Sequence, residues 1–191
     1  MDSSDLELLE RIAAGEHEAM HDFYERFYPR LHHFLRSRLH GDRALVEDAL
    51  QEIFLNVWRS AGSFRNQSSV ATWVFQIAYH QALRSLRRQD AREKRDHAAT
   101  GEHFNLSRGT VSLENAVIDR ITLVNALRQL SDKHRDVLEL VFYYGFAPDE
   151  VAIILAIAPG TVKSRISYAR RALLHLLNEA PVETPVREMQ P

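Results

Sequence analysis

Hydrophobic residues recur along most of this chain at the spacing of an α-helix, three or four positions apart. The strongest case is the segment 44–60, whose hydrophobic face consists of Val46, Leu50, Ile53, Phe54 and Val57. The pattern predicts helices over residues 3–14, 17–40, 43–60, 69–95, 113–130, 133–144, 148–155 and 159–178. Strict alternation of polar and apolar residues, which marks a half-buried strand, is nearly absent. We therefore expect an all-α fold.

A polar segment divides these helices into two groups. Residues 96–111 contain few large apolar side chains, and Gly101 and Gly109 favour irregular backbone there. The chain has 191 residues, enough for two small domains that each bury a modest core. The predicted division is a helical domain at 1–95, a flexible linker at 96–111, a second helical domain at 112–178 and a disordered tail at 179–191.

Residues with special backbone preferences stand where several helices are expected to begin and end. Ser112 can cap the helix that follows it, and Gly145 suits the left-handed position after the helix that precedes it. Pro148 and Pro159 fit the first turn of a helix, because an N–H group there has no partner within the helix. These positions support the predicted helix boundaries.

The segment 148–166 has the spacing of a helix-turn-helix, with a short helix, a tight turn and a second helix. In the second helix a buried stripe is predicted at Val162, Ile166, Ala169 and Leu173. The opposite face carries small or polar residues that suit a DNA major groove: Gly160, Lys163, Ser164, Ser167 and Arg171. An ordinary helical hairpin with a solvated basic face fits the local pattern as well.

Composition and charge narrow the function classes. The chain has no cysteine, which excludes disulfides, thiolate metal sites and a thiol catalyst. Its net charge is −2, but the distribution is uneven. Six acidic residues and one arginine lie in residues 1–20, whereas residues 84–95 hold six basic and two acidic residues, and residues 159–178 hold four basic residues and no acid. This distribution indicates two separate basic surfaces.

The N-terminal half contains two candidate binding features. In the helix at 43–60, Asp48, Gln51 and Glu52 frame Leu55 on the side opposite the core stripe, which fits a protein-binding patch with an apolar centre or an ordinary solvated face. Further on, a polar turn carries Phe64, and aromatic residues of the next helix precede the basic run, an arrangement that suits single-stranded DNA. The aromatic residues are Trp73, Phe75 and Tyr79. Each also fits a core position, Trp73 in particular.

Taken together, these segments resemble the extracytoplasmic-function (ECF, group IV) RNA polymerase sigma factors. The resemblance covers most of the chain and rests on residues 46–58, 63–65, 72–78, 86–88, 127–131, 136–140 and 159–173. The chain departs from the family pattern at His80 and Arg84, where the family often has Asn and Asp, at Ser131, which replaces a proline, and at Ala158, which replaces a small polar cap.

The resemblance implies three sets of site residues. Contacts to the clamp helices of the largest polymerase subunit would come from Asp48, Gln51, Glu52 and Leu55. Recognition and melting of the −10 element would involve Phe64, Arg65, Asn66, Gln67, Ser68, Ser69, Trp73, His80, Arg84, Arg87 and Arg88. Recognition of the −35 element would involve Thr161, Lys163, Ser164, Arg165, Ser167 and Arg171. The implied partners are core polymerase, including its flap, promoter DNA, and an anti-sigma factor or other protein inhibitor.

Two other functions fit parts of the sequence. A stand-alone helix-turn-helix regulator would also explain the C-terminal half. The motif formed by His17, Glu18 and His21 matches the H-E-x-x-H pattern of zinc hydrolases, but a pattern with three defined positions arises readily by chance in a chain with 10 histidines. We expect no catalysis, cofactor or metal. Because no secretion signal or membrane span is evident, we also expect a cytoplasmic protein without membrane insertion.

Overall fold

The computed structural model describes residues 4–100, 125–127 and 129–179. These residues form helices joined by turns and contain no strand, which confirms the all-α prediction. The chain separates into two compact units, whose main boundary lies between residues 110 and 111. Each unit is described by itself.

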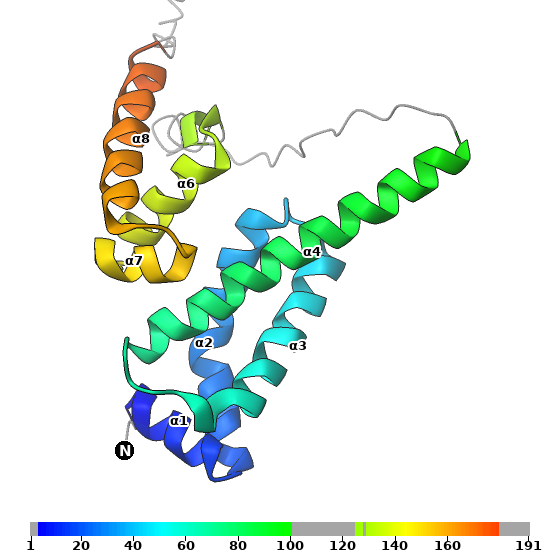
Figure 1. The fold of residues 1–191 in the computed structure, drawn as a ribbon, viewed down its shortest axis with the longest axis vertical. Helices are drawn as coiled ribbons and strands as arrows, with labels where there is room; N and C mark the ends of the chain where they lie inside the picture. The colour runs from blue at the N-terminus through cyan, green and yellow to red at the C-terminus, as the bar shows by residue number, and fades with distance from the viewer. Residues whose placement is uncertain (1–3, 101–124, 128, 180–191) are drawn as a thin grey trace, which may run out of the picture. The chain divides into compact units, whose positions relative to one another are not determined.

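The described part of the first unit, up to residue 100, contains four helices and one short 3₁₀ turn (Figure 1). The elements are α1 (Asp5–Ala13), α2 (His17–Arg38), α3 (Arg43–Ser60), η1 (Ala61–Ser63) and α4 (Val70–Thr100). Every pair of these four helices is in contact. The fold is therefore a compact bundle in which each helix turns one apolar face toward the other three.

Phenylalanine side chains fill the centre of this bundle. Phe23 and Phe27 stack with their ring centres 4.3 Å apart, and Phe34 meets Phe75 edge to face at 5.1 Å. All four are at most 1% exposed, and burying one such side chain stabilises the fold by about 1.5–3 kcal/mol. The Arg38 guanidinium lies 3.6 Å from the centre of the Phe34 ring and covers this end of the core.

The residues between α2 and α3 explain why the chain turns there. His40 and Gly41 both have positive φ values, 54° and 77°, which reverse the chain after α2. The Asp42 side chain then accepts a hydrogen bond from the Leu45 N–H at 3.1 Å and caps the start of α3. A short polar side chain and a glycine thus stand at the positions where the backbone needs them.

The second unit contains α6 (Asp132–Leu138), the π-helical segment η2 (Glu139–Tyr143), α7 (Pro148–Leu155) and α8 (Pro159–Glu179). The helix predicted at 133–144 therefore widens into a π turn over its second half. Gly145 follows with a φ of 77°, which confirms its expected left-handed conformation. Of the helix predicted at 113–130, residues 125–127 and 129 are described and helical, whereas the Ser112 cap lies outside the described residues.

The fourth helix extends further than predicted. We expected it to end at residue 95, but α4 continues through Thr100 and takes in the first part of the predicted linker. Residues 96–100 are polar but contain Ala98 and Ala99, good helix formers, and the first residue that disfavours a helix is Gly101. Low hydrophobicity alone was therefore an insufficient signal for the end of this helix.

Candidate functional site

The outer face of α3 is defined by what its inner face buries. The predicted core stripe of this helix is buried, with all five side chains at most 7% exposed, and it consists of Val46, Leu50, Ile53, Phe54 and Val57. A helix that buries one face must turn the other outward. The structure accordingly leaves all four members of the predicted patch exposed: Asp48, Gln51, Glu52 and Leu55.

Leu55 is the apolar centre of this α3 patch and is 46% exposed. Around it stand two carboxylates, Asp48 and Glu52, and the amide of Gln51. An exposed leucine framed by polar groups has the composition of a small protein-binding surface, in which an apolar centre is surrounded by a polar rim.

Tyr24 packs against α3 and was not singled out from the sequence. It lies on α2, is 38% exposed, and its ring centre is 4.7 Å from that of Phe54 on α3. Burial of this ring raises the pKa of the Tyr24 phenol, and the nearby Tyr28 and Glu47 raise it further, so the phenol is neutral at physiological pH. The available signal was the spacing of Tyr24, Tyr28 and His32, whose rings follow one another along α2.

The loop at residues 64–69 connects η1 to α4 and is anchored at both ends. At its start, the Phe64 N–H donates to the Ala61 carbonyl at 3.1 Å. At its end, the Ser69 hydroxyl accepts from the Thr72 N–H at 3.1 Å and lies 2.7 Å from the hydroxyl oxygen of buried Thr72. Ser69 therefore caps α4. Between these anchors, Asn66 has a left-handed backbone with a φ of 54°.

The side chains of this loop offer both an aromatic surface and polar groups. Phe64 is half-buried, and its ring centre lies 5.4 Å from that of Trp73. Ser68 is also half-buried, while the remaining loop residues are exposed: Arg65, Asn66, Gln67 and Ser69. Unpaired bases can stack on the two adjacent rings, and the cationic Arg65 side chain can bind a phosphate group.

The three aromatic residues of α4 occupy different environments. Phe75 is fully buried, so it belongs to the core and is not available for stacking. Trp73 is half-buried, and the prediction that it occupies a core position with Val70, Val74 and Ile77 is therefore only partly correct. Helical spacing placed it near the core stripe, but it lies at the edge of that stripe, where Phe64 covers part of its ring. Tyr79 is half-buried.

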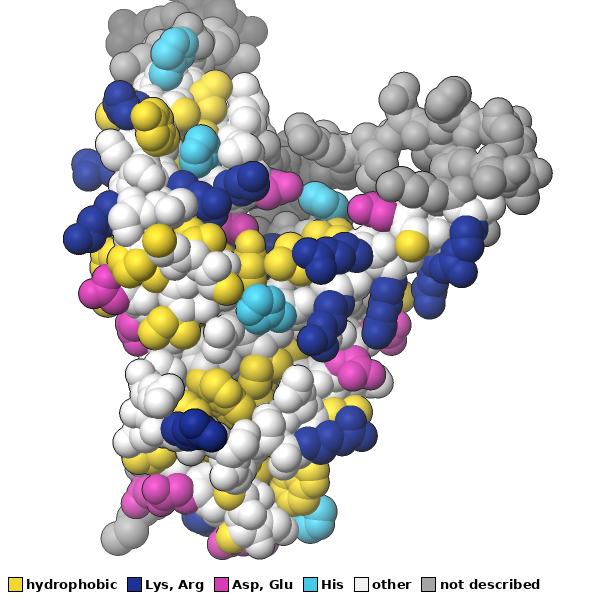
Figure 2. Space-filling model, in the orientation of Figure 1, with side chains coloured by type: hydrophobic (Ala, Val, Ile, Leu, Met, Phe, Trp, Pro, Cys, Tyr) yellow, Lys and Arg dark blue, Asp and Glu magenta, His cyan; other side chains and the backbone are white. Residues whose placement is uncertain are grey.

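Beyond these aromatics, α4 carries a basic face. The predicted residues His80, Arg84, Arg87 and Arg88 are all exposed. Arg92 and Arg95, which were not among the predicted site residues, are exposed as well. Figure 2 shows Lys and Arg side chains gathered along this helix. The surface is suited to phosphate groups, since several cations follow one another along a straight element.

In the second unit, α7 and α8 form the predicted helix-turn-helix. The turn between them contains Ala156, whose φ of 52° places it in the left-handed region. The Ala158 carbonyl accepts from the Thr161 and Val162 N–H groups at 2.9 and 3.2 Å, which starts α8 without a side-chain cap. The turn and the first residues of α8 are thus organised by backbone geometry.

The two faces of α8 separate largely as expected. Val162 and Ala169 are fully buried, while Ile166 and Leu173 are half-buried, so the stripe is less deeply covered than predicted. The opposite face is exposed and consists of Gly160, Lys163, Ser164, Ser167 and Arg171. Thr161 and Arg165 flank it and are half-buried. This face combines cations, hydroxyls and a residue without a side chain, as a major groove requires.

The H-E-x-x-H motif finds no support as a metal site. Within the described parts of the chain, no group of three or more histidine, aspartate or glutamate side chains could hold a metal ion. His17 instead stacks on Trp58, with ring centres 5.0 Å apart and planes 14° from parallel. The exposed His17 at the start of α2 therefore packs on the Trp58 side chain of α3.

No single helix within the described residues is both long and apolar enough to cross a membrane.

Comparison with known proteins identifies the family. A model described as Sigma-70 region 2 matches residues 23–92, and one described as Sigma-70, region 4 matches residues 120–173. The ECF RNA polymerase sigma factor SigL of Mycobacterium tuberculosis is 34% identical over 171 residues, which cover 89% of this chain and 95% of SigL. The chain belongs to the ECF family of RNA polymerase sigma factors. It is a transcription initiation factor and not an enzyme.

Other comparisons agree with this assignment. The RNA polymerase sigma factor CarQ of Myxococcus xanthus is 32% identical over 178 residues, covering 92% of this chain and 98% of CarQ. Among solved structures, the sigma factor RpoE of Bartonella quintana in complex with the anti-sigma factor NepR is 29% identical, with a TM-score of 0.64, over 84% of this chain and 99% of RpoE. CnrH, solved with the cytosolic domain of CnrY, shares the fold at 21% identity and a TM-score of 0.64.

Proposed function

We propose that this sigma factor acts in the cytoplasm, where it binds core RNA polymerase through the α3 patch and directs it to promoters with two separate DNA-reading surfaces. The observation that carries this proposal is the position of these surfaces. The α3 patch, the 64–69 loop, the basic face of α4 through Arg92 and the outer face of α8 all lie within the two segments that match sigma-factor regions. The proposed domains are residues 1–95 and 112–178, with 96–111 as the linker.

The α3 patch suits a helical partner such as the clamp helices of the largest polymerase subunit. Leu55 supplies apolar contact, while Asp48 and Glu52 supply negative charge for basic groups on the partner. Contacts at the apolar centre of an interface usually contribute more to affinity than contacts at its rim. The affinity for core polymerase should therefore depend most on Leu55, with the carboxylates setting the orientation.

The first DNA-reading surface would bind the melted −10 element. A base turned out of the duplex could be held by the exposed residues of the 64–69 loop, with Phe64 and Trp73 providing rings for stacking. Upstream, the cations of α4 would hold the phosphates. His80 and Arg84, where this chain departs from the family pattern, lie on that exposed basic face, so they are placed to add contacts of their own.

The second surface would read the −35 element in duplex form. Lys163, Ser164 and Ser167 lie on the exposed face of α8, and Arg165 flanks it, so these groups can reach base edges and phosphates in the major groove. By its resemblance to the family, the same domain would contact the polymerase flap. A protein inhibitor is a further proposed partner, because the related RpoE was solved in complex with an anti-sigma factor.

Charge reversal on α3 tests the polymerase contact. Glu52→Arg should lower the amount of core polymerase that co-purifies with the full chain, because a cation would face the basic groups expected on the partner. Glu18→Arg is the matched control, since it makes the same charge change at an exposed position on α2. Circular dichroism should show the same helical content for both variants. Normal core binding by Glu52→Arg would contradict the assignment of this patch.

Footprinting separates this proposal from a stand-alone regulator. The purified chain should protect promoter DNA weakly and in a salt-sensitive way, because only the polymerase would hold the two reading surfaces at a defined spacing. Addition of core polymerase should produce specific protection of both elements and promoter opening. Tight, sequence-specific protection of both elements by the chain alone would favour the regulator.

A further inference from the structure

The first helix, α1, packs against η1, the short turn that immediately precedes the 64–69 loop. It precedes residues 23–92, the segment that matches Sigma-70 region 2, and none of its residues was a predicted site residue. Three side chains fasten it to the bundle, Leu8, Leu9 and Ile12, each at most 2% exposed. The same helix contacts η1 and α4, the two elements between which the loop runs.

The last residue of α1 and the middle residue of η1 lie side by side. A Cβ atom placed on Gly62 would lie 3.8 Å from the Cβ atom of Ala13, at ordinary van der Waals distance. Ala61, next to Gly62, is 5% exposed and supplies the carbonyl that accepts from the Phe64 N–H. The position of Phe64 therefore follows from the position of η1, which in turn rests on the last turn of α1.

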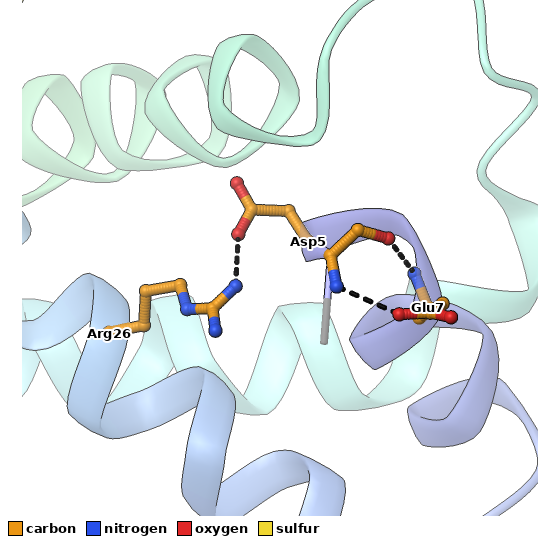
Figure 3. Close-up of polar contacts among 4 residues, drawn as sticks. Asp5, Glu7 and Arg26 are labelled. Carbon is orange, nitrogen blue, oxygen red and sulfur yellow. Dashed lines mark hydrogen bonds and ion pairs between the residues drawn. The ribbon is translucent and has the colours of Figure 1, made fainter. Parts of the chain in front are cut away.

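The orientation of α1 is set by polar contacts at its two ends. At its start, Ser4 and Glu7 form a reciprocal capping box, and the Asp5 carboxylate forms an ion pair with Arg26 of α2 at 2.9 Å (Figure 3). At its end, Arg11 donates to the Glu16 carboxylate at 2.8 Å across the turn into α2. The helix is thus tied to α2 on either side of its buried residues.

The two ends of the loop are supported differently. The end at Ser69 is fastened by α4 itself, through the hydrogen bonds to Thr72. The end at Phe64 has η1 as its support, and η1 packs on α1 and α3. We propose that α1 is a positioning element that holds the Phe64 end of the loop in the conformation that binds the −10 element. This inference rests on the proposed function of the loop.

The first test compares a variant that weakens the packing of α1 with a matched variant elsewhere in the core. Leu9→Ala removes a buried contact of α1, whereas Leu35→Ala removes the same side-chain volume from the α2 part of the core, and Leu35 is also fully buried. Each change leaves a cavity in the core and lowers the free energy of unfolding. Holoenzyme with Leu9→Ala should bind a single-stranded −10 oligonucleotide at least about threefold more weakly, a change of roughly 0.6 kcal/mol. Holoenzyme with Leu35→Ala should bind it normally.

A disulfide provides the rescue. The chain contains no cysteine, and the 3.8 Å between the Cβ positions of residues 13 and 62 is the usual separation in a disulfide. In the background of Leu9→Ala, the pair Ala13→Cys and Gly62→Cys should restore −10 binding to within about twofold when oxidised, because it holds α1 against η1. Reduction of the same sample should remove the rescue.

Tryptophan fluorescence reports the loop directly. The chain has two tryptophans, so Trp58→Phe leaves Trp73 as the single emitter beside Phe64. In this background, Leu9→Ala should shift the Trp73 emission to longer wavelength as Phe64 moves away, and the oxidised cysteine pair should reverse the shift.

Three outcomes would separate the possible failures. Equal loss of −10 binding in Leu9→Ala and Leu35→Ala, or no rescue by the oxidised pair, would overturn the positioning role of α1. Full −10 binding by Leu9→Ala, together with impaired binding by Phe64→Ala and Arg65→Ala, would overturn it while leaving the loop as the DNA-reading site. Normal binding by the two loop variants as well would instead show that the proposed function of the loop is wrong.

Discussion

The two units carry their candidate DNA-reading residues on different kinds of backbone. In the first unit these residues lie on the irregular 64–69 loop, beside a half-buried tryptophan and an exposed basic helix. In the second unit they lie on one face of α8, a regular helix. The contrast matches two forms of DNA, because unpaired bases need rings and a shaped loop, whereas an intact major groove accepts a straight helix.

The hydrophobic cores of the two units also differ. The first unit is built around phenylalanines, with Phe23 and Phe34 fully buried, whereas the fully buried side chains in the described part of the second unit include the aliphatic Val137 and Val162. Large rings leave large cavities when they are removed, and aliphatic side chains leave smaller ones. The 64–69 loop therefore belongs to the unit whose core is more sensitive to the truncation of a single side chain.

The largest expected effect is a loss of stability, and it should distinguish two neighbouring aromatic residues of α4. Phe75→Ala should lower the free energy of unfolding by about 3–5 kcal/mol, because Phe75 is fully buried against Phe34. Trp73→Ala should cost less stability, since Trp73 is half-buried, but it should weaken binding of the −10 strand by the holoenzyme. Chemical denaturation and oligonucleotide binding would measure the two effects. A larger stability loss for Trp73→Ala would remove the distinction between core and reading surface.

The next effect concerns the α3 patch. Leu55→Ala should weaken core polymerase binding by about tenfold, equivalent to 1.4 kcal/mol, because Leu55 is the exposed apolar centre of that patch. Glu18→Ala is the control, since Glu18 is exposed on α2 of the same unit and lies outside the α3 patch. Titration of labelled sigma variants with core polymerase would give both affinities. Equal affinities for the two variants would place the polymerase contact elsewhere.

A smaller effect is expected on the −35 surface. Lys163→Ala should reduce promoter affinity and lower the dependence of log K on log salt concentration by about one unit, because one phosphate contact is lost. Ser164→Ala should leave the salt slope unchanged, since it removes no charge, and its hydroxyl donates to the Thr161 carbonyl within α8. An unchanged slope and affinity for Lys163→Ala and Arg165→Ala would contradict the recognition-helix assignment.

The smallest effect is a gain in stability at the turn of the helix-turn-helix. Ala156 has a φ of 52°, a conformation that costs a residue with a Cβ atom about 1–2 kcal/mol. Glycine relieves that strain but loses more chain entropy on folding, so Ala156→Gly should raise the free energy of unfolding by roughly 0.5–1 kcal/mol. Ala158→Gly, at a position without positive φ, should not stabilise the protein. Thermal unfolding would compare the two variants, and no gain for Ala156→Gly would argue against strain in this turn.

Prediction from the sequence worked best where one periodic pattern decided the answer. The burial of the α3 stripe and the exposure of the four residues opposite were both predicted correctly, because regularly spaced apolar residues define the one face that the helix can bury. Prediction was less accurate for residues at the edge of a buried helix face. Trp73 has core spacing in the sequence, but its exposure depends on how far Phe64 covers it, which no local pattern contains.

The helical class, the helix-turn-helix, the family resemblance and the order of polar and apolar faces can all be read from the amino-acid sequence, since each depends on residues a few positions apart. Three contacts are visible in the folded protein alone: α1 packs against η1, Tyr24 lies against Phe54, and His17 stacks on Trp58. These contacts join residues far apart in the chain, and they form only when whole helices pack, so hydrophobic spacing within one helix does not specify them.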